Sequence, residues 1–355
     1  MNNNLSSLRV RDIGEQGLLE RLQRFCPPDI IGDDAAVLET LPNQSLIVTT
    51  DMLIDGVHFS DVTTSPEDAG WRAAAANLSD LAAMGATPVG ITVGLGLPAD
   101  VTVSWVERLY QGMTECLSKY HVPIVGGDIV RSPITTLAIT AFGQANPNFI
   151  IRRSTAQVGD AIVITGIHGA SRAGLELLLN PEIGQNLKTE AKAALITAHQ
   201  RPNPRLDVLP ILWKIVESQS KIQNLKSKIT VAGMDSSDGL ADAILQICRA
   251  SQVGAVIEFS KIPLSSAFKN WLTPEKSLEY ALYGGEDFEL VLCLPPETAL
   301  ALVQNLGTGA AIIGTITPGS NVILHHEKAE IPDQVLSLSQ GFQHFAQAGF
   351  PRPFH

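Results

Sequence analysis

Acidic side chains recur where apolar stretches of this 355-residue sequence end, and one such place also carries a histidine. In "TTDMLIDGVHF" (49–59), Asp51 follows an apolar run, and Asp55 and His58 follow in a predicted loop. Side chains of these types can form a turn, bind a metal ion or act as the acids of a hydrolase. This stretch alone leaves all three interpretations open.

A predicted hairpin brings a second acid close to Asp51. Residues 35–50 read as two short strands around a turn, which would place Asp34 and Asp51 at the same open end. With the hydroxyl groups of Thr49 and Thr50, these acids form an oxygen-rich set that suits a hard cation. Solvated turn residues would explain each acid singly.

A third acid lies on a predicted helix over residues 65–86. Asp80 follows Asn77 by three residues, so both side chains share one helical face, and their neighbours are mostly Ala, Leu and Met. A solvent-facing Asp80 is one interpretation. A carboxylate directed at a metal ion is the other.

Three further motifs place acids beside glycines or serines. In "VPIVGGDIVRS" (122–132) and "YGGEDFELVL" (283–292), a Gly-Gly pair could admit a phosphate close to the backbone, or simply form a turn. In "MDSSDGLADA" (234–243), N-capping of the following helix would account for one acid but not for two. The acids of these motifs are Asp128, Asp235, Asp238, Glu286 and Asp287.

This inventory favours metal-assisted phosphoryl transfer. The sequence has no GxxxxGK[ST], HExxH or GxSxG motif, and it offers many carboxylates but few positioned lysines. Several Mg²⁺ ions would then supply the positive charge that ATP and a phosphorylated acceptor require. A phosphate monoester is largely ionised at pH 7, so no residue is expected to act as a general base.

Composition and charge limit the other function classes. The formal net charge of −11 argues against unassisted binding to nucleic acid or to an anionic membrane. The four cysteines are far apart and form no CxxC motif, and no apolar run is long enough to span a bilayer. We therefore expect a soluble, cytoplasmic protein.

The hydrophobic pattern predicts an α/β (α+β) chain of two domains, 1–150 and 151–355. In both halves, segments with helical spacing alternate with short apolar strands. The predicted helices cover residues 14–25, 65–86, 103–120, 170–180, 238–250 and 296–305.

Six motifs in this order resemble the thiamine-monophosphate kinase family, which belongs to the superfamily of aminoimidazole ribonucleotide synthetase. They are "GDDAAV", "TTDMLIDGVHF", "NLSDLAAMGATP", "GGDIVRS", "MDSSDGLADA" and "GGEDFEL". The resemblance extends from about residue 12 to "GFQHF" (341–345). It implies ATP-dependent phosphorylation of thiamine monophosphate to thiamine diphosphate by direct transfer.

The resemblance also implies an architecture and a set of site residues. It implies a homodimer in which the N-terminal sheets form a barrel, with a C-terminal α/β domain that completes the active-site cleft. The positions that correspond to Mg²⁺ ligands are Asp34, Thr49, Thr50, Asp51, Asp80, Asp128, Asp235 and Asp238. Those that correspond to ATP contacts are Tyr110, Gly127, Asp128, Arg153 and Ser237, and those for thiamine monophosphate are His58, Glu286 and Phe342.

Two departures from the family pattern leave roles open. The arginine motif reads "IRRSTAQVGD", so Arg152 could take the role expected of Arg153, and Phe342 could pack in the core as well as stack on thiamine. A sister enzyme of the superfamily is the alternative, although the lysine expected after "DGV" in aminoimidazole ribonucleotide synthetases is absent. A non-catalytic protein that binds Mg²⁺ or nucleotide is a further alternative.

Overall fold

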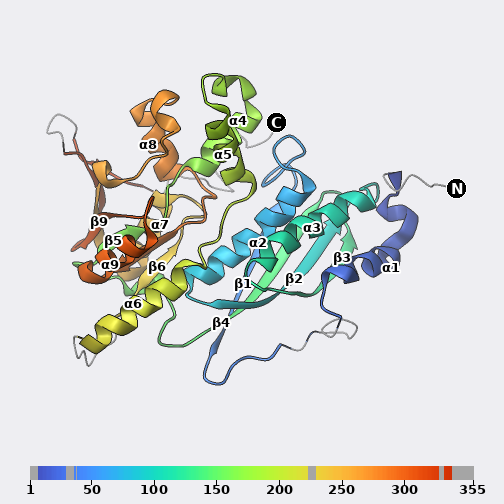
Figure 1. Cartoon of the computed structure of the whole chain (residues 1–355), viewed down its shortest axis with the longest axis horizontal. Helices are drawn as coiled ribbons and strands as arrows, with labels where there is room; N and C mark the ends of the chain where they lie inside the picture. The colour runs from blue at the N-terminus through green and yellow to red at the C-terminus, as the bar shows by residue number, and fades with distance from the viewer. Residues whose placement is uncertain (1–6, 29–35, 37, 223–228, 328–331, 338–355) are drawn as a thin grey trace. The chain divides into compact units, whose positions relative to one another are not determined.

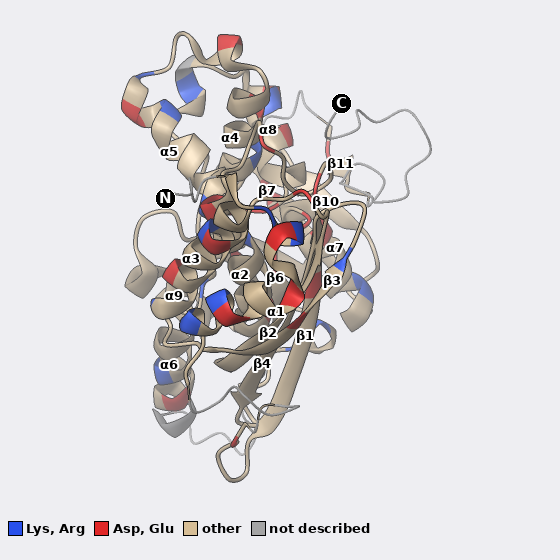
Figure 2. Ribbon diagram, turned by 90° about the vertical axis from the view of Figure 1, so that its right-hand side faces the viewer, with Lys and Arg blue, Asp and Glu red and all other residues tan. Residues whose placement is uncertain are grey.

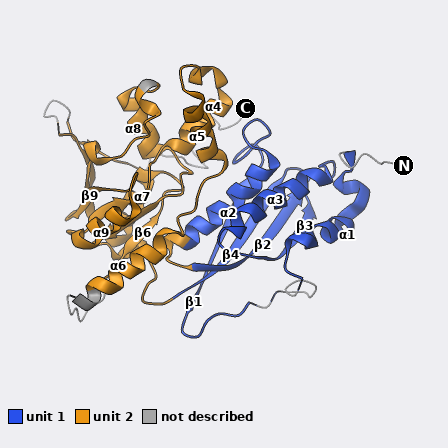
Figure 3. Cartoon of the chain, viewed as in Figure 1, with its two compact units in different colours: residues 1–81, 87–145, 346–355 blue, residues 82–86, 146–345 orange. Residues whose placement is uncertain are grey.

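The computed structural model describes residues 7–28, 36, 38–222, 229–327 and 332–337, and these residues form two compact units (Figure 3). Unit 1 contains residues up to 81 together with 87–145, and unit 2 contains 82–86 and the described residues from 146 on. Across the described residues, no helix has the length and apolar character needed to cross a bilayer. Each unit has its own sheet.

Unit 1 is a four-stranded sheet with helices on one face (Figure 1). The strand order is β1-β4-β2-β3, with β1 antiparallel to β4 and β2 parallel to β3. The elements in chain order are α1 (Val10–Leu22), η2 (Gln23–Phe25), β1 (Ser45–Ile54), α2 (Pro66–Ala83), β2 (Thr87–Leu97), α3 (Val103–Ser118), β3 (Ile124–Arg131) and β4 (Thr136–Ala145).

The two faces of this sheet differ because side chains alternate along each strand. Inward-facing residues of the central strands, such as Val93 and Ile139, are almost fully buried on the face that α2 and α3 cover. On the other face, Leu46, Val48 and Met52 of β1 are each 53 % exposed. Among the described residues, no helix covers this apolar stretch of the unit 1 sheet.

The predicted hairpin over residues 35–50 is wrong in the part that the structure describes. Residues 36 and 38–40 form no strand, and β1 pairs along its whole length with β4 instead. The pairing with β4 covers ten residues in register, and β1 remains the edge strand of the sheet. Asp34 lies outside the described residues.

Unit 2 is built on a mixed seven-stranded sheet with the order β11-β10-β7-β9-β5-β8-β6. Its strands are β5 (Ala161–Ile164), β6 (Ala232–Asp235), β7 (Gly254–Glu258), β8 (Leu290–Leu294), β9 (Ala311–Thr317), β10 (Val322–His325) and β11 (Gln334–Val335). Its α-helices are α4 (Ala170–Leu179), α5 (Thr189–Gln200), α6 (Val208–Ile222), α7 (Leu240–Ser251), α8 (Pro274–Tyr283) and α9 (Pro296–Leu306), with short 3₁₀ turns η3 (Arg153–Thr155), η4 (Pro181–Gly184), η5 (Phe259–Lys261) and η6 (Phe268–Asn270).

Two clusters of buried side chains stabilise unit 2. The larger one joins the sheet to α7, whose buried face includes Ile244 and Ile247. The smaller one joins α4, α5 and α8 around Leu177, Phe268 and Tyr280. The helix α8, which our sequence interpretation did not anticipate, therefore completes a second small core.

Asn77 connects the edge strand β1 to helix α2 within unit 1. Its side chain is fully buried; Oδ1 accepts a hydrogen bond from the backbone N–H of Asp51 (3.2 Å), and Nδ2 donates to the carbonyl of Ala73 (3.0 Å). This contact fixes the strand position that carries Asp51. The polar residue on the helix thus has a structural role.

We predict that Asn77→Leu lowers the free energy of unfolding by about 1–3 kcal/mol, because it leaves the N–H of Asp51 without its acceptor. Asn305→Ala is the matched control, since exposed Asn305 makes the same bond to a carbonyl four residues earlier (2.8 Å). Its cost should stay within roughly 0.5 kcal/mol. Urea denaturation measures both, and equal losses would contradict the assigned role.

Candidate functional site

The first group of site residues lies in unit 1, where β1 meets α2. Thr49 and Asp51 are two residues apart on β1 and therefore point to the same face, and the Thr49 hydroxyl donates a hydrogen bond to Asp80 of α2. Asp80 is half-buried, so it is neither a fully solvated surface acid nor a core residue. The structure thus brings together three of the predicted metal ligands.

Thr50 points to the opposite face of the sheet from Thr49. Its Oγ1 lies 2.9 Å from Oγ1 of Thr140 on β4, and Thr140 in turn pairs in register with Thr92 on β2. Thr92 and Thr140 both line a cavity on this face. The side chain of Thr50 therefore belongs with that cavity rather than with Thr49, Asp51 and Asp80.

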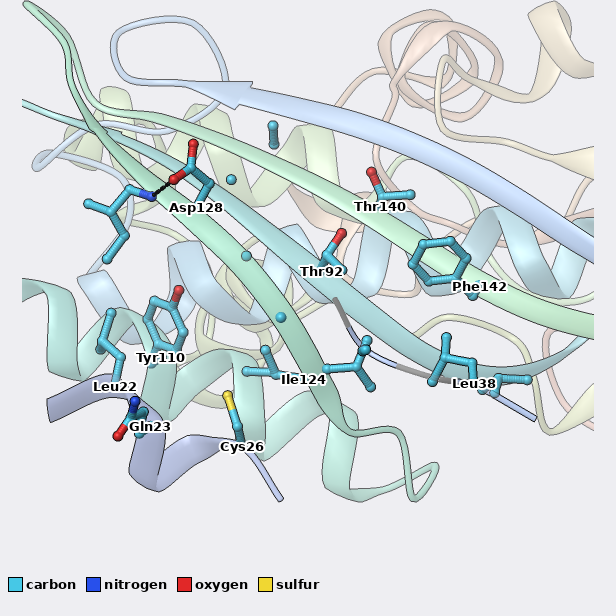
Figure 4. A pocket seen from close by; sticks show the side chains of 18 of the residues that line it. Leu22, Gln23, Cys26, Leu38, Thr92, Tyr110, Ile124, Asp128, Thr140 and Phe142 are labelled. Atoms are coloured by element: carbon cyan, nitrogen blue, oxygen red, sulfur yellow. Dashed lines mark hydrogen bonds between the residues drawn. The ribbon is translucent and has the colours of Figure 1, made fainter. Parts of the chain in front are cut away.

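The cavity has a volume of about 950 Å³ and lies between β2–β4, α1, η2 and α3 (Figure 4). Its lining includes three residues that were predicted to contact ATP, namely Tyr110, Gly127 and Asp128. Among its described lining residues none is Lys or Arg, and most are apolar, such as Leu22 and Ile124. Such a cavity suits an aromatic base more readily than an unaccompanied phosphate chain.

Contacts within unit 1 account for the properties of three cavity residues, Gly127, Asp128 and Tyr110. A Cβ atom at Gly127 would lie 2.1 Å from the carbonyl oxygen of Val93, so glycine allows β3 to approach β2 closely. Asp128 is exposed, and its Oδ1 accepts a hydrogen bond from the N–H of Ile129 (2.9 Å). Burial raises the pKa of Tyr110 far above its usual value, so this phenol stays protonated as a hydrogen-bond donor.

His58 is held by the loop that follows β1. Its Nδ1 accepts a hydrogen bond from the N–H of Ile54 (3.1 Å), so the neutral ring carries its proton on Nε2. Its carbonyl accepts a bond from buried Arg72 (3.2 Å). The proton of the His58 ring therefore lies on Nε2, and Nδ1 is occupied by the backbone.

The second group of site residues lies in unit 2, on the loop between β6 and α7. Asp235 is the last residue of β6 and is 2 % exposed, and the Ser237 hydroxyl donates to its Oδ1 (3.3 Å). Helix α7 begins after Gly239, and no side chain caps it. Neither Asp235 nor Asp238 is therefore the N-cap residue of α7.

Glu286 and its neighbours interlock with this loop. The N–H of Glu286 donates to the carbonyl of Ser237 (2.7 Å), and a Cβ atom at Gly285 would lie 2.6 Å from that same oxygen. Glu286 and Phe288 adopt φ values of 66° and 52°, an unusual region for residues other than glycine. Close backbone packing therefore explains one glycine of "GGEDF" and fixes Glu286.

Asp287, in contrast, has a structural role. It accepts hydrogen bonds from the N–H groups of Gly169 (2.6 Å) and Ser171 (2.9 Å) and so caps the start of α4 from a distant part of the chain. Burial raises the pKa of Asp287 to about 7, against the effect of these amide donors. In this motif the adjacent acids Glu286 and Asp287 thus have different roles.

The structure gives a reason to prefer Arg153 over Arg152. Burial raises the pKa of Asp242 on α7, the charge of Asp238 adds to this, and the charge of Arg153 acts in the opposite direction. Arg153 therefore lies within electrostatic reach of the β6–α7 loop. The backbone of Arg152 instead accepts a hydrogen bond from Gly233 on β6 (3.3 Å).

The donor set of both groups fits Mg²⁺, since it consists of carboxylate and hydroxyl oxygens. Among the residues that the structure describes, no three His, Cys, Asp or Glu side chains gather into a metal site. Mg²⁺ usually binds through one or two carboxylates together with water and substrate phosphates. Strands β1, β2 and β4 also carry no Lys or Arg (Figure 2).

One residue that contacts the β6–α7 loop, His168, was missed in the sequence. It is fully buried, and its Nε2 lies 2.9 Å from the hydroxyl oxygen of Ser236. A single histidine in a predicted loop gave no signal, because its contact is 68 residues away in the chain. Of the predicted residues, Asp34 and Phe342 lie outside the described part of the chain.

Burial lowers the pKa of His168 to about 4. Because the unfolded chain binds this proton more tightly than the folded protein, the stability that His168 contributes as a neutral group is present above about pH 6.5 and is lost as the pH falls. We predict that between pH 7 and 5 the wild-type protein loses about 2 kcal/mol more unfolding free energy than His168→Gln. Urea titrations at both pH values test this, and parallel losses would contradict it.

The chain matches two families described as AIR synthase related protein, the N-terminal domain over residues 32–145 and the C-terminal domain over 157–327. It is 53 % identical over 342 residues to the thiamine-monophosphate kinase of Synechococcus elongatus, covering 96 % of this chain and 99 % of that protein.

Solved structures agree with these matches. The thiamine-monophosphate kinase of Stenotrophomonas maltophilia has a TM-score of 0.74 at 32 % identity, with 87 % of this chain and 95 % of that one covered. The structure of AaThiL complexed with AMPPCP and TMP has a TM-score of 0.68 at 32 % identity, with 92 % and 98 % covered. This chain therefore belongs to the thiamine-monophosphate kinase family, with the two-domain fold of the AIR synthase related proteins.

Proposed function

We propose that this protein transfers the γ-phosphoryl group of ATP directly to thiamine monophosphate, with thiamine diphosphate and ADP as products. The observation that carries the proposal is the 53 % identity to a thiamine-monophosphate kinase over 96 % of the chain. The related structure with AMPPCP and TMP supports the choice of both substrates.

In the proposed reaction, an oxygen of the thiamine monophosphate phosphate attacks the γ-phosphorus of ATP. The bond from that phosphorus to the β-phosphate oxygen breaks, and ADP leaves. The attacking phosphate is largely ionised at pH 7, so no side chain has to remove a proton. Catalysis then rests on positioning and on charge stabilisation.

Residues of both units take part in this proposal. Mg²⁺ ions, when bound, would offset the charge of the phosphates, and side chains within each unit would hold such ions through oxygen atoms. The proposed ligands are Thr49, Asp51, Asp80, Asp128, Asp235 and Asp238; the side chain of Thr50 is not among them, because it points to the opposite face of the sheet from Thr49. Tyr110, Gly127, Asp128, Arg153 and Ser237 would contact ATP, and His58 and Glu286 would contact thiamine monophosphate.

The cavity beside β3 supports a proposal in which different residues bind the nucleoside and the phosphates of ATP. Its apolar walls and the Tyr110 hydroxyl suit the nucleoside, whereas Asp128 lies where a cation could join the phosphates to the protein. Because no described lining residue is basic, the phosphates need such a cation. The four cysteines, all of them described, form no disulfide bond, as is usual in a reducing compartment, which supports a cytoplasmic enzyme.

We predict that Asp51→Asn lowers kcat by at least roughly 100-fold while the protein stays folded, because the amide removes a charge that a bridging Mg²⁺ requires. Asp100→Asn removes the same charge from an exposed position, where the side chain is 66 % accessible, and should leave kcat within twofold. The assay follows thiamine diphosphate by chromatography after incubation with MgATP and thiamine monophosphate. ADP and phosphate without thiamine diphosphate would overturn the proposed function.

We further propose that the open face of the unit 1 sheet pairs with a second copy of the chain, as the barrel of the family implies. Val48 and Met52 expose apolar surface there, and Leu46, which lines the cavity, extends the row along β1. Singly exposed apolar residues are ordinary, but a contiguous row on a sheet indicates an interface.

We predict that Val48→Lys together with Met52→Lys converts the dimer to a monomer. Two ammonium groups cannot be buried on an apolar face without a large desolvation cost. Leu300→Lys is the control, since Leu300 of α9 is also 53 % exposed but lies in unit 2. Sedimentation equilibrium measures the mass of each protein, and a wild-type monomer would contradict the proposed interface.

A further inference from the structure

We infer that His168 is a positioning residue, which acts through Ser236 to hold the loop of Asp235, Ser237 and Asp238 in its working conformation. The inference rests on the proposed function, because that function gives this loop its role toward Mg²⁺ and ATP. His168 itself contacts no proposed substrate or metal ligand in the described structure. Its effect would therefore be indirect.

The hydrogen bonds of His168 determine which ring nitrogen carries the proton. The ring is fully buried, with Nδ1 3.2 Å from the carbonyl oxygen of Gly166 and Nε2 2.9 Å from the hydroxyl of Ser236. A carbonyl oxygen can only accept, so Nδ1 carries the proton. In the neutral ring Nε2 is then an acceptor, and it shares the single proton of the Ser236 hydroxyl with the carbonyl oxygen of Glu289 (3.1 Å).

Ser236 is fully buried at the centre of the loop that it would position. Its N–H donates to the carbonyl of Glu289 (2.9 Å), and its own carbonyl accepts the N–H of Gly239 (3.0 Å). The two bonds restrain its backbone, and the bond to His168 restrains its side chain. Because Asp235 and Ser237 are its immediate neighbours, a shift of Ser236 moves both.

A partly buried ion pair supports the strand ends beside Ser236. Arg205 donates to the carboxylate of Glu289 (2.5 Å) and to the carbonyl of Thr165 (2.7 Å), and the Thr165 hydroxyl donates to Glu289 (2.6 Å). Thr165 directly follows β5, and Glu289 directly precedes β8. His168 therefore reaches Ser236 from the frame formed by these strand ends.

The same loop contacts Glu286, which is predicted to bind thiamine monophosphate. The carbonyl of Ser237 accepts the N–H of Glu286, so a displaced loop would disturb Glu286 as well. Residues that only orient metal ligands typically change metal affinity or activity by about 10- to 100-fold when they are removed. Loss of the His168 bond should therefore weaken binding of the Mg²⁺–nucleotide complex by a factor in this range.

The test compares His168→Leu, Ser236→Ala, the double variant and His168→Gln by calorimetric titration with Mg²⁺ and AMPPCP. His168→Leu and Ser236→Ala should each raise Kd by about 10-fold or more. The Kd of the double variant should not exceed the higher of the two single-variant values, because both substitutions remove the bond between His168 and Ser236. His168→Gln should recover part of the affinity, since its amide oxygen can accept from Ser236. Amide hydrogen exchange of residues 235–239 should accelerate in His168→Leu.

Thr298→Val is the matched control in unit 2. It removes another buried side-chain hydrogen bond, from Thr298 of α9 to Gln219 of α6, and should leave Kd and the exchange of residues 235–239 unchanged. Wild-type Kd in His168→Leu, multiplicative effects in the double variant, or an equal loss in Thr298→Val would overturn the inference. Failure of the proposed function differs from these outcomes, because the wild-type protein would then form no thiamine diphosphate while the binding pattern persisted.

Discussion

Carboxylates in this protein are oriented by two different kinds of donor, and the site depends on that difference. The hydroxyl of Thr49 orients Asp80, the hydroxyl of Ser237 orients Asp235, and a backbone N–H orients Asp128. A neutral donor fixes the direction of a carboxylate without cancelling its charge. Glu289, which supports the fold, is instead paired with Arg205. None of these three hydrogen bonds cancels the charge of the carboxylate, as a cation site requires.

Much of the fold could be predicted because local pattern and tertiary packing agree. The helices α2, α3, α7 and α9 have amphipathic or alanine-rich sequences with clear stop signals, and they lie close to the expected positions. The hairpin over residues 35–50 could not be judged from local pattern, since the partner of β1 is β4, about ninety residues later. Helix α8 was missed because its buried face is small and is covered by α4 and α5 rather than by the sheet.

The site was predictable in composition but not in arrangement. Acids at strand ends pointed to an oxygen-ligand site, and Asp51, Asp80 and Thr49 do lie together. The pleat of β1 turns Thr50 to the other face, which the family motif alone does not reveal. His168 could not have been found from the sequence, because its contact with Ser236 forms only when the fold brings the residues after β5 close to those after β6.

We propose that these carboxylates bind divalent cations, which in turn bind the phosphates of the substrates. The direct measurement is an anomalous difference map from crystals grown with Mn²⁺, AMPPCP and thiamine monophosphate. We expect Mn²⁺ peaks at direct coordination distance, about 2.1 Å, from phosphate oxygens and from carboxylate oxygens of Asp51, Asp80, Asp235 or Asp238. Mn²⁺ bound to the nucleotide alone, with no carboxylate of this set as a ligand, would contradict it.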